Sequence, residues 1–535
     1  MYSGKFINLI EEVREMSKYL MAIDAGTGSV RAVIFDLAGN QIAAHSKEWE
    51  HKEDPRYPGS MDFDWDNNWR LAAKCVKESM RKAKINEEDI LAVSTTSMRE
   101  GIVLYDVDGK EIWACANVDS RSNNEVKDLM DIDSGLEKDI YKISGQTFAL
   151  GALPRVLWVK KNMPEIYKKT ETITMFNDWL IYKLSGVLST EPSNGCTTGI
   201  FDIKKRDWEP KIAERCGLKS HMFPEVYEPG TVVGKVNEQS SRETGLSQNT
   251  LVVSGGGDAQ LGAIGVGLVG EDQVAVFGGS FWQLEYNTKK PVIDEDARIR
   301  VNCHAVEDMW NYEAIAFFPG LILRWYRDAF CDREKEVSKL TGTDPYDLMN
   351  ERAKKIPAGS YGMMGAFSNV MDYISWRHAA PTFTNFQLDP EKYNKYTFYR
   401  SLLENAALVT KGHLEMVKEL TGNSPEEVIF ANGASKSELW SQIMADVLEV
   451  KIKVPVVKEA TALGAAICAG VGAGVYESIE EAANSLVVWD KEYIPNEENV
   501  KTYRELYNKW KAMYEVQLAI ADGGVTEHMW KAPGI

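Results

Sequence analysis

The stretch Ile23-Asp24-Ala25-Gly26-Thr27-Gly28-Ser29-Val30-Arg31 decides the fold of this chain. An apolar run precedes it and a β-branched run follows it, a pattern typical of a strand, a glycine-rich turn and a second strand. The two glycines let backbone N–H groups approach a ligand closely, where a Cβ atom would block the approach. Since Asp24 adds one carboxylate beside the turn, the stretch suits a polyphosphate and its Mg²⁺. An ordinary β-hairpin turn is the alternative, because such a turn needs only one glycine.

The composition is that of a large globular protein with a surplus of acidic residues. The chain has 535 residues, 44% of them hydrophobic and 26% charged, which predicts roughly two to four domains with a sizeable core. A formal net charge of −18 disfavours nucleic acid and anionic membranes as partners, because both need a basic surface. Seven scattered cysteines without a C-x-x-C pair favour free thiols in a reducing cytoplasm.

Neither the N-terminal segment nor the longest uncharged stretch has the pattern of a targeting or membrane signal. Residues 1–18 mix acidic and basic side chains and lack the apolar core of a signal peptide. The longest uncharged stretch, residues 460–476, is rich in Gly and Ala and short for a membrane span. We therefore expect a buried helix there and a cytoplasmic protein.

The order of predicted elements indicates an internal duplication. Strand patterns occupy residues 19–24, 30–36 and 41–50, followed by a helix over 65–83, a strand at 90–94, a hairpin over 101–116 and a helical region over 153–184. A strand, a glycine-rich turn and further strands return at residues 273–277, 278–280, 281–286, 299–306 and 311–318. We therefore predict two similar halves with a boundary near residue 265, facing each other across a cleft. The chain lacks G-x-x-x-x-G-K-[ST], so a P-loop enzyme is not expected.

Two strand ends carry candidate chemistry. Gly255-Gly256-Gly257-Asp258 follows a buried strand, and its carboxylate could accept a proton from a substrate hydroxyl; a cap for the next helix is the alternative. Arg99-Glu100 ends another strand and could hold a polyol, the guanidinium donating and the carboxylate accepting. A surface ion pair is the alternative for those two residues. The small loop Asn432-Gly433-Ala434-Ser435 before a helix could admit a nucleoside, or could be a routine turn.

Several short motifs follow the order found in the FGGY carbohydrate kinases, and the first resembles the phosphate motif of the actin-like ATPase superfamily. The motifs lie at residues 24–31, 99–100, 178–186, 193–194 ahead of 201–203, 256–258, 278–280, 432–435 and 459–466. Each is weak alone, and their shared order over about 450 residues carries the resemblance.

The resemblance implies an α/β fold of two RNase H-like domains around a central cleft. Residues 1–265 would form an N-terminal domain with the substrate-binding and general-base residues, and residues 266–535 a C-terminal domain with the nucleotide-binding loops. ATP and Mg²⁺ would be the cofactors and a small molecule the substrate. The function implied is transfer of a phosphoryl group from ATP to an alcohol.

The resemblance also assigns roles to individual residues. Asp258 would be the general base, Arg99 and Glu100 would hold substrate oxygens, and Trp282 would form a wall of the substrate pocket. Asp24 would act on Mg²⁺ through water. The nucleotide contacts implied are Gly26, Thr27, Gly28, Ser29, Gly278, Gly279, Ser280, Gly433, Ala434 and Ser437.

Four segments carry a narrower resemblance within the family: residues 97–105, 112–119, 456–464 and 530–534. They are similar to the kinases that phosphorylate the terminal hydroxyl of linear dihydroxypentanedione, a quorum signal. A kinase for a ketopentose or polyol, such as xylulose or ribulose, is the alternative. Asn117 stands where sugar kinases carry an aromatic side chain, and residues 362–368 replace a usual second-domain loop, so contacts at both places stay open.

Two alternatives belong to other functional classes. A nucleotide-dependent clamp would bind ATP without transferring phosphate, and Asp258 argues against it because a clamp needs no base for an alcohol. A regulator would bind the signal without turnover. The presence of Asp24, Asp258 and both glycine-rich turns argues against that reading.

Overall fold

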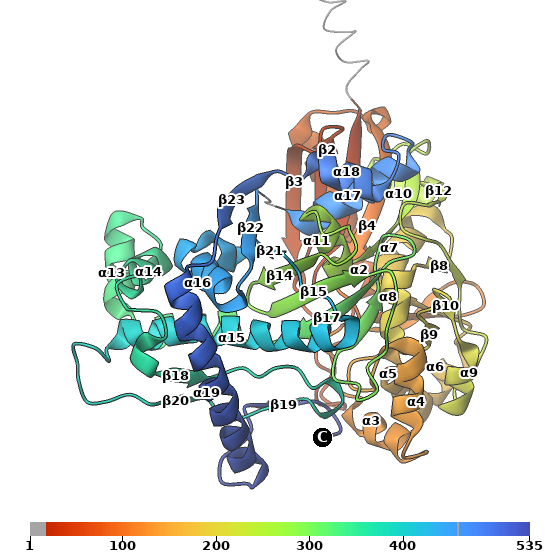
Figure 1. Ribbon diagram of the computed structural model, residues 1–535. Coiled ribbons are helices and arrows are strands. Elements are labelled where there is room, and N and C mark those ends of the chain that lie inside the picture. The colour runs from red at the N-terminus through yellow and green to blue at the C-terminus, as the bar shows by residue number, and fades with distance from the viewer. Residues whose placement is uncertain (1–17, 457–458) are drawn as a thin grey trace, which may run out of the picture.

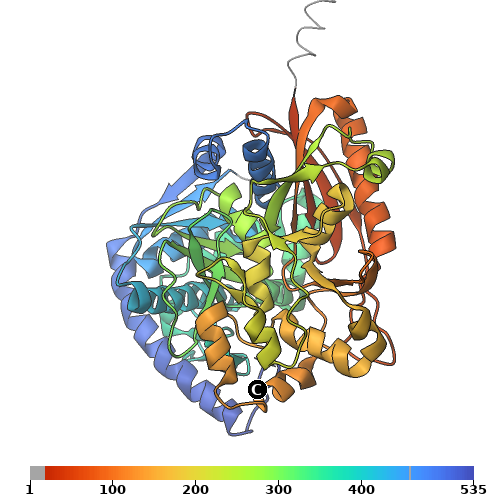
Figure 2. The same ribbon diagram turned by 90° about the vertical axis from the view of Figure 1, so that its right-hand side faces the viewer.

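The computed structural model describes residues 18–456 and 459–535. Expectations about the segment 1–17 and about Val457 and Lys458 lie outside the described residues. Two β-sheets dominate the architecture, one near the top of Figure 1 and one near its centre, and Figure 2 shows the same arrangement from the side. The first sheet has the strand order β12-β13-β4-β1-β2-β3. Its strands are β1 Tyr19–Ala25, β2 Ser29–Asp36, β3 Gln41–Glu48, β4 Ile90–Ser97, β12 Val232–Lys235 and β13 Leu251–Gly257.

The second sheet repeats the order of the first. Its order is β16-β17-β15-β14-β21-β22-β23, so the hairpin pair β14 and β15 lies in the middle as β1 and β2 do. The strands are β14 Val274–Gly278, β15 Trp282–Thr288, β16 Arg300–Cys303, β17 Trp310–Ile315, β21 Glu427–Ala431, β22 Lys451–Pro455 and β23 Trp489–Tyr493. In the first sheet β1 pairs in parallel with β4, and in the second sheet β14 pairs in parallel with β21. The duplicated α/β fold expected from the sequence is confirmed.

Other elements complete the two halves. The first predicted helix is α2, Trp65–Ala83, which packs on β2 and β3. In the second half the long helix α15, Lys395–Thr421, runs beneath the sheet (Figure 1). The remaining elements are η1 Glu87–Asp89, β5 Ile102–Tyr105, β6 Glu111–Cys115, α3 Asn123–Met130, α4 Leu136–Ser144, α5 Ala152–Asn162, α6 Pro164–Lys169, β7 Thr172–Met175, α7 Phe176–Ser185, β8 Ser189–Thr190, α8 Pro192–Gly195, η2 Cys196–Thr198, β9 Phe201–Asp202, β10 Asp207–Trp208, α9 Pro210–Arg215, β11 Glu225–Val226, α10 Glu238–Thr244, α11 Asp258–Gly265, α12 Pro319–Phe330, α13 Asp332–Thr341, α14 Pro345–Ala353, η3 Ser360–Gly362, β18 Met364–Ala366, η4 Tyr373–Ser375, β19 Arg377–His378, β20 Thr382–Thr384, η5 Gly433–Lys436, α16 Glu438–Leu448, α17 Ala460–Gly472, α18 Ile479–Leu486, α19 Glu497–Asp522 and β24 Trp530–Lys531.

One predicted element is wrong in part. The helical region expected over residues 153–184 is interrupted by strand β7, Thr172–Met175. The β-branched run Thr172-Ile173-Thr174 favours extended backbone, and β7 pairs antiparallel with β5, Ile102–Tyr105. Pairing with a distant strand therefore overrides the helical pattern at this point.

Two helices lie at the junction of the halves. Helix α11 packs against β4 and β13 of the first sheet through Leu261 and Ile264, and against Phe277 and Ile429 of the second. Helix α17 follows β22 of the second sheet but packs against β1, β4 and β13 of the first. The helices touch each other closely, because a Cβ atom on Gly464 would lie 2.0 Å from the Leu261 carbonyl oxygen. This contact positions one sheet relative to the other.

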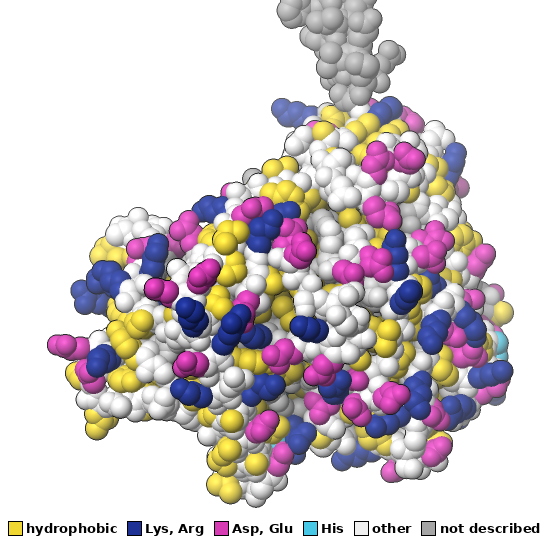
Figure 3. Space-filling view, in the orientation of Figure 1, with side chains coloured by type: hydrophobic (Ala, Val, Ile, Leu, Met, Phe, Trp, Pro, Cys, Tyr) yellow, Lys and Arg dark blue, Asp and Glu magenta, His cyan; other side chains and the backbone are white. Residues whose placement is uncertain are grey.

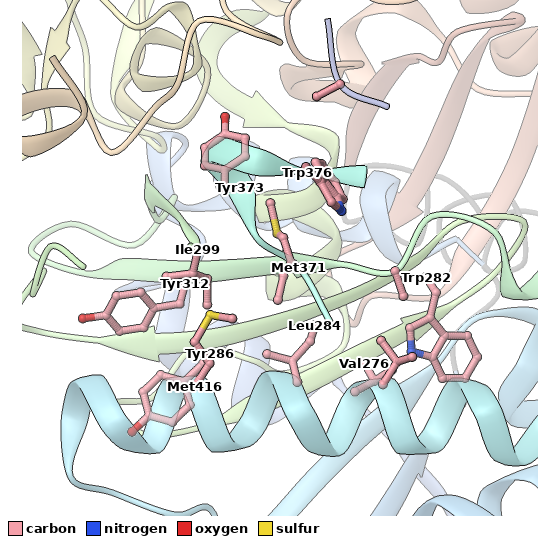
Figure 4. Packing of buried hydrophobic residues seen from close by; sticks show 14 of the residues in the cluster. Val276, Trp282, Leu284, Tyr286, Ile299, Tyr312, Met371, Tyr373, Trp376 and Met416 are labelled. Carbon is pink, nitrogen blue, oxygen red and sulfur yellow. The ribbon is translucent and has the colours of Figure 1, made fainter. Parts of the chain in front are cut away.

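The two faces of the second sheet differ in chemistry. Val276, Trp282, Leu284 and Tyr286 pack with Met416 of α15 on the face seen in Figure 4. The side chains between them in sequence point the other way, toward the first half, and many are polar. These buried residues include Glu285, Arg300, Asn302, Asn311 and Glu313. The second sheet therefore meets the first half through a polar face.

The surface shows no field of a single sign on the face drawn in Figure 3, where acidic and basic side chains are interspersed. All seven cysteines are buried as free thiols. Among the described helices, none combines the length and apolarity needed to cross a bilayer. Within the 460–476 stretch, residues Ala460–Gly472 form helix α17, which is largely buried, as the sequence predicts.

Candidate active site

Three predicted site residues lie at one edge of the first sheet. Strands β1, β4 and β13 are parallel, and their register aligns Ala25 with Ser97 and Ser97 with Gly257. Asp24 therefore lies at the end of β1, Arg99 just beyond β4 and Asp258 just beyond β13. Ligands of open α/β sheets bind at this carboxyl edge of the strands. The sheet brings together residues far apart in sequence.

Asp258 begins helix α11 without capping it, because Gly257 is the N-cap residue. Its Oδ1 accepts a hydrogen bond from the Ala259 amide at 2.9 Å, and the Arg99 Nε lies 3.7 Å away. The surrounding protein raises the pKa of Asp258 to about 7 by displacing water; Arg99 opposes this, and Glu100 and Asp24 add to it. The side chain remains 44% exposed, so an incoming hydroxyl can reach it and water moderates the shift. A reachable carboxylate with a raised pKa is suited to general-base chemistry.

Arg99 and Glu100 are not a surface ion pair with each other. Arg99 is buried and forms a bidentate pair with Glu313 of β17, its Nη2 lying 3.0 Å from the Glu313 Oε1. Glu100 instead accepts from the Arg300 Nη2 at 2.7 Å, and the backbone of Glu100 has a left-handed φ of 64°. Each residue of the pair thus has its ionic partner in the second half.

Backbone carbonyls of the first glycine-rich turn are engaged by hydrogen bonds from Trp49 and His51. The carbonyl oxygens of Gly26 and Thr27 accept from the Trp49 indole at 3.1 Å, and that of Gly28 accepts from the Trp49 amide. His51 also donates to the Thr27 carbonyl, at 2.6 Å. Because carbonyl oxygens repel phosphate, this arrangement favours an anion on the other side of the turn. A Cβ atom placed on Gly28 would have no neighbouring atom within 4 Å.

Asp24 is only 4% exposed and is held by Arg31, which reaches its Oδ2 from Nη2 at 2.6 Å and from Nε at 2.9 Å. Arg31 also bridges to Glu459 of the second half, at 2.6 Å. Burial raises the pKa of Asp24, while Arg31 opposes the rise. Arg31 engages only Oδ2, so the second oxygen fits a Mg²⁺ ion or its water. Within the described residues no cluster of three or more His, Cys, Asp or Glu side chains could hold a metal, so phosphate oxygens would have to complete the ligands.

A pocket of about 550 Å³ opens beside the second glycine-rich turn. It brings together six predicted nucleotide contacts: Gly278, Gly279, Ser280, Gly433, Ala434 and Ser437. Arg324, Arg327 and Lys436 also line it together with Asp344 and Asp347, so cationic groups are available to a polyphosphate beside two carboxylates. Tyr346 and Leu323 add apolar surface for a ring. The first turn, residues 26–29, does not line this pocket.

The structure corrects the expectation for Trp282. This side chain is fully buried on the α15 side of the second sheet, as Figure 4 shows, and its Nε1 donates to Thr410 at 2.9 Å. It stacks on Trp440 and presents no surface to a substrate. The strand alternation, which points Trp282 toward α15 and its neighbour Gln283 away, explains the error. Residues 362–368 likewise lie outside the pocket lining, where Met364–Ala366 forms β18.

Sequence reasoning missed the residues that the second half contributes. Glu313 and Arg300 contact the predicted pair Arg99 and Glu100, and Arg324, Arg327 and Lys436 line the pocket. A signal for the first two was present, because β16 and β17 alternate polar and apolar residues. Such alternation is typical of a strand with one face in water. Only the fold shows that the polar face meets the other half.

Two sheets of matching strand order, a reachable carboxylate at one strand edge and a pocket with cationic side chains at the second glycine-rich turn are the arrangement expected of a two-lobed phosphotransferase. Residues 19–265 match the N-terminal domain, and residues 274–473 the C-terminal domain, of the FGGY family of carbohydrate kinases. The chain therefore belongs to the FGGY family of carbohydrate kinases.

Relatives agree over nearly the whole chain. An autoinducer-2 kinase of Yersinia pestis bv. Antiqua (strain Angola) is 50% identical over 518 residues, which cover 97% of this chain and 98% of that protein. The autoinducer-2 kinase of Salmonella paratyphi B (strain ATCC BAA-1250 / SPB7) is 48% identical over 522 residues, with the same coverage.

Solved structures share the fold at low identity. A xylulose kinase from Rhodospirillum rubrum superposes with a TM-score of 0.83 at 20% identity, covering 94% of this chain and 99% of that one. A Plasmodium falciparum glycerol kinase with ADP gives a TM-score of 0.80 at 20% identity, covering 93% and 98%.

Proposed function

We propose that this protein is an ATP-dependent kinase that phosphorylates the terminal hydroxyl of linear autoinducer-2, 4,5-dihydroxy-2,3-pentanedione. The observation that carries the proposal is the 50% identity to autoinducer-2 kinase over 97% of the chain. The family itself supplies the reaction class, phosphoryl transfer from ATP. The identity of the acceptor is proposed from the relatives and from the chemistry of the side chains around Asp258.

The acceptor pocket offers groups that match this substrate. Glu100 Oε2 and Asp258 Oδ2 have no protein partner among the described residues, and both can accept from hydroxyl groups. Each terminal nitrogen of the Arg99 guanidinium donates one N–H to Glu313. The remaining N–H groups can donate to carbonyl oxygens of a substrate. A diol beside a diketone uses both kinds of group.

We assign the catalytic roles as follows. Asp258 accepts the proton of the terminal hydroxyl, while Arg99 and Glu100 orient the acceptor. The turns at Gly26–Ser29 and Gly278–Ser280 bind phosphates, and Gly433, Ala434 and Ser437 line the nucleoside. Mg²⁺, held near Asp24 through water, would neutralise phosphate charge when bound. Since phosphoryl transfer needs little covalent chemistry, positioning supplies most of the catalysis.

The remaining proposals concern context. Residues 1–265 would bind the substrate and supply the base, and residues 266–535 would supply the nucleotide-binding loops. Glu313 and Arg300 of the second half contact Arg99 and Glu100 of the first. The partner is a small molecule, with neither nucleic acid nor membrane, which the net charge of −18 supports. The protein acts in the cytoplasm, in keeping with its free, buried cysteines.

The test compares four acceptors: dihydroxypentanedione, xylulose, ribulose and glycerol. We expect kcat/KM to favour dihydroxypentanedione by ~10–100-fold per unmatched buried group, because an unpaired polar group costs ~1–3 kcal/mol. Mass spectrometry of the product should give the mono-phosphorylated diketone. A ketopentose that equals or exceeds dihydroxypentanedione would leave only the family assignment. ATP binding without transfer to any acceptor would favour a clamp.

A further inference from the structure

The polar face of the second sheet contributes to a group of four charged side chains that joins the two halves, three of them buried and one, Glu100, 15% exposed. Arg99 and Glu100 come from the first half, and Arg300 and Glu313 from adjacent strands β16 and β17 of the second. Arg300 and Glu313 are 1% and 0% exposed. Two guanidinium groups thus meet two carboxylates in a nearly dry interface, where a partnerless charge is costly.

Glu313 holds both arginines at once. Its Oε1 accepts from the Arg99 Nη2 at 3.0 Å and from the Arg300 Nη1 at 3.3 Å. Its Oε2 accepts from the Arg99 Nη1 and, at 2.9 Å, from the Asn302 amide. Burial alone would raise the pKa of Glu313, but the two arginines outweigh it and hold the pKa at about 2. This carboxylate therefore stays ionised and fixes the plane of the Arg99 guanidinium.

Arg300 performs the corresponding task for Glu100. Its Nη2 lies 2.7 Å from the Glu100 Oε1, and its Nε donates to the Gln146 side chain at 2.6 Å. The Glu100 backbone, in the left-handed region at φ 64°, is held in turn by Arg155 through its carbonyl oxygen. The Glu100 carboxylate is thus oriented from the second half, with one oxygen left over.

We propose that Glu313 and Arg300 are positioning residues of the acceptor site, which fix Arg99 and Glu100 from the opposite half, so that the second half completes the site. This inference rests on the proposed function only for the identity of the acceptor. A direct consequence is coupling with the nucleotide. Glu313 pairs in register with Glu285 of β15, and β15 returns from the Gly278–Ser280 turn through its pairing with β14. A nucleotide that fixes this turn also fixes the strands that carry Glu313 and Arg300.

The test uses Glu313→Gln and Arg300→Lys in the full chain. We expect kcat/KM for dihydroxypentanedione to fall ~100-fold in each, the scale found when a positioned group is displaced by about 1 Å. The Kd of ADP, measured by calorimetry, should stay within about twofold, since neither residue lines the nucleotide pocket. In the wild type, ADP should tighten acceptor binding, and both variants should lose that coupling.

Glu228→Gln is the matched control. Glu228 forms a bidentate pair with Arg206, at 2.7 and 2.6 Å, and Arg206 also crosses to the second half through the His304 carbonyl. This control weakens the same interface away from Arg99, and the acceptor parameters and the coupling should be unchanged. If Glu228→Gln lowers kcat/KM as much as Glu313→Gln does, the proposal is wrong and only interface stability matters.

A second readout does not depend on the acceptor. Amide hydrogen exchange of residues 97–101 should be faster in Glu313→Gln and Arg300→Lys than in the wild type and in Glu228→Gln. If xylulose is the better acceptor, the proposed substrate is wrong. The role of Glu313 and Arg300 is then tested by the same kinetic measurements with xylulose. Should Glu313→Gln not fold, Arg300→Lys alone tests the proposal, because lysine keeps the positive charge and loses the two-pronged guanidinium geometry. Unchanged exchange and unchanged kcat/KM in Arg300→Lys would overturn the proposal.

Discussion

At the scale of single residues, the raised pKa of Asp258 has a consequence for activity. A general base must be ionised, and the pKa of Asp258 is about 7, so kcat/KM should rise with pH and level off above that value. Asp258→Asn should lower kcat by ~10²–10⁴-fold and leave the Kd of ATP nearly unchanged. Steady-state kinetics from about pH 5 to 9 measure the rates, and calorimetry measures the Kd of ATP. A variant within about threefold of the wild type would contradict the assignment.

The same residue affects stability with the opposite sign. A carboxylate whose pKa is raised on folding from 3.8 to about 7 binds protons more tightly in the folded state, so stability falls as pH rises between those values. Asp258→Asn should therefore melt at a higher temperature than the wild type at pH 8, and the difference should shrink toward pH 4. A lower melting temperature for the variant at pH 8 would show that the carboxylate stabilises the fold.

A second residue-scale prediction concerns Asn432, at the entrance of the 433–436 turn. Its backbone has φ 71° and ψ −160°, a region that only glycine adopts readily and that costs other residues about 1–3 kcal/mol. Asn432→Gly should therefore raise the melting temperature, partly offset by the entropy of glycine in the unfolded chain. Asn432→Ala is the comparison and should melt below both. Equal melting temperatures for the glycine and alanine variants would show that the backbone there is not strained.

The sequence predicted the chemistry of the first half better than that of the second. Asp24, Arg99 and Asp258 follow recognisable strands, so their convergence at one sheet edge follows from parallel pairing. Glu313 and Arg300 were missed because a polar strand face looks solvent-exposed until a second domain covers it. Trp282 was misplaced because one residue of register decides which face a side chain occupies.

At the scale of elements, the close approach of α11 and α17 depends on glycine. A Cβ atom on Gly464 would lie 2.0 Å from a carbonyl oxygen of α11, and one on Gly265 would lie 1.9 Å from a carbonyl oxygen of α17. Gly464→Ala must push the helices apart, and overpacking of this kind costs about 1–3 kcal/mol. We expect a lower melting temperature and a weaker response of acceptor binding to nucleotide.

Gly262→Ala on α11 is the control for that prediction. Its Cβ would lie 3.5 Å from the Thr461 hydroxyl oxygen, an ordinary contact, and alanine favours the helix by about 0.5–1 kcal/mol over glycine. The control should melt at or above the wild-type temperature. If Gly464→Ala behaves like Gly262→Ala, the two helices do not depend on close contact.

Elements were predictable where local pattern and tertiary pairing agree. Helix α2 has the apolar spacing of a half-buried helix, and its bounds match those expected, Trp65–Ala83. Strand β7 was missed because its four residues form a strand only by pairing with β5. The packing of α11 on both sheets and of α17 on the first could not be predicted, because each helix is apolar on nearly all sides and its sequence does not say which sheet it covers.

At the scale of the whole molecule, charge pairs and a helix pair hold the halves together around the site. Arg99 with Glu313, Arg300 with Glu100 and Arg31 with Glu459 each join residues of opposite halves. Arg31 thus connects Asp24 to Glu459, the N-cap residue of α17, and the other two pairs connect Arg99 and Glu100 to the second sheet. A ligand bound near Asp24 and a ligand bound near Arg99 and Glu100 would therefore both act on the interface between the two halves.

Closure on ligand is the prediction that follows from this arrangement. Asp258 belongs to the first half, and the pocket beside the Gly278–Ser280 turn is lined by the second, so under the proposed function a ternary complex must bring Asp258 and the phosphates within reach of each other. Small-angle scattering should give a radius of gyration of roughly 24 Å for a compact chain of this length, and a smaller value with ADP and dihydroxypentanedione together than with either alone. Gly464→Ala should reduce the difference, because its halves meet at a shifted helix pair. An identical radius with saturating amounts of both ligands would mean that the halves are already closed, and that transfer needs no hinge.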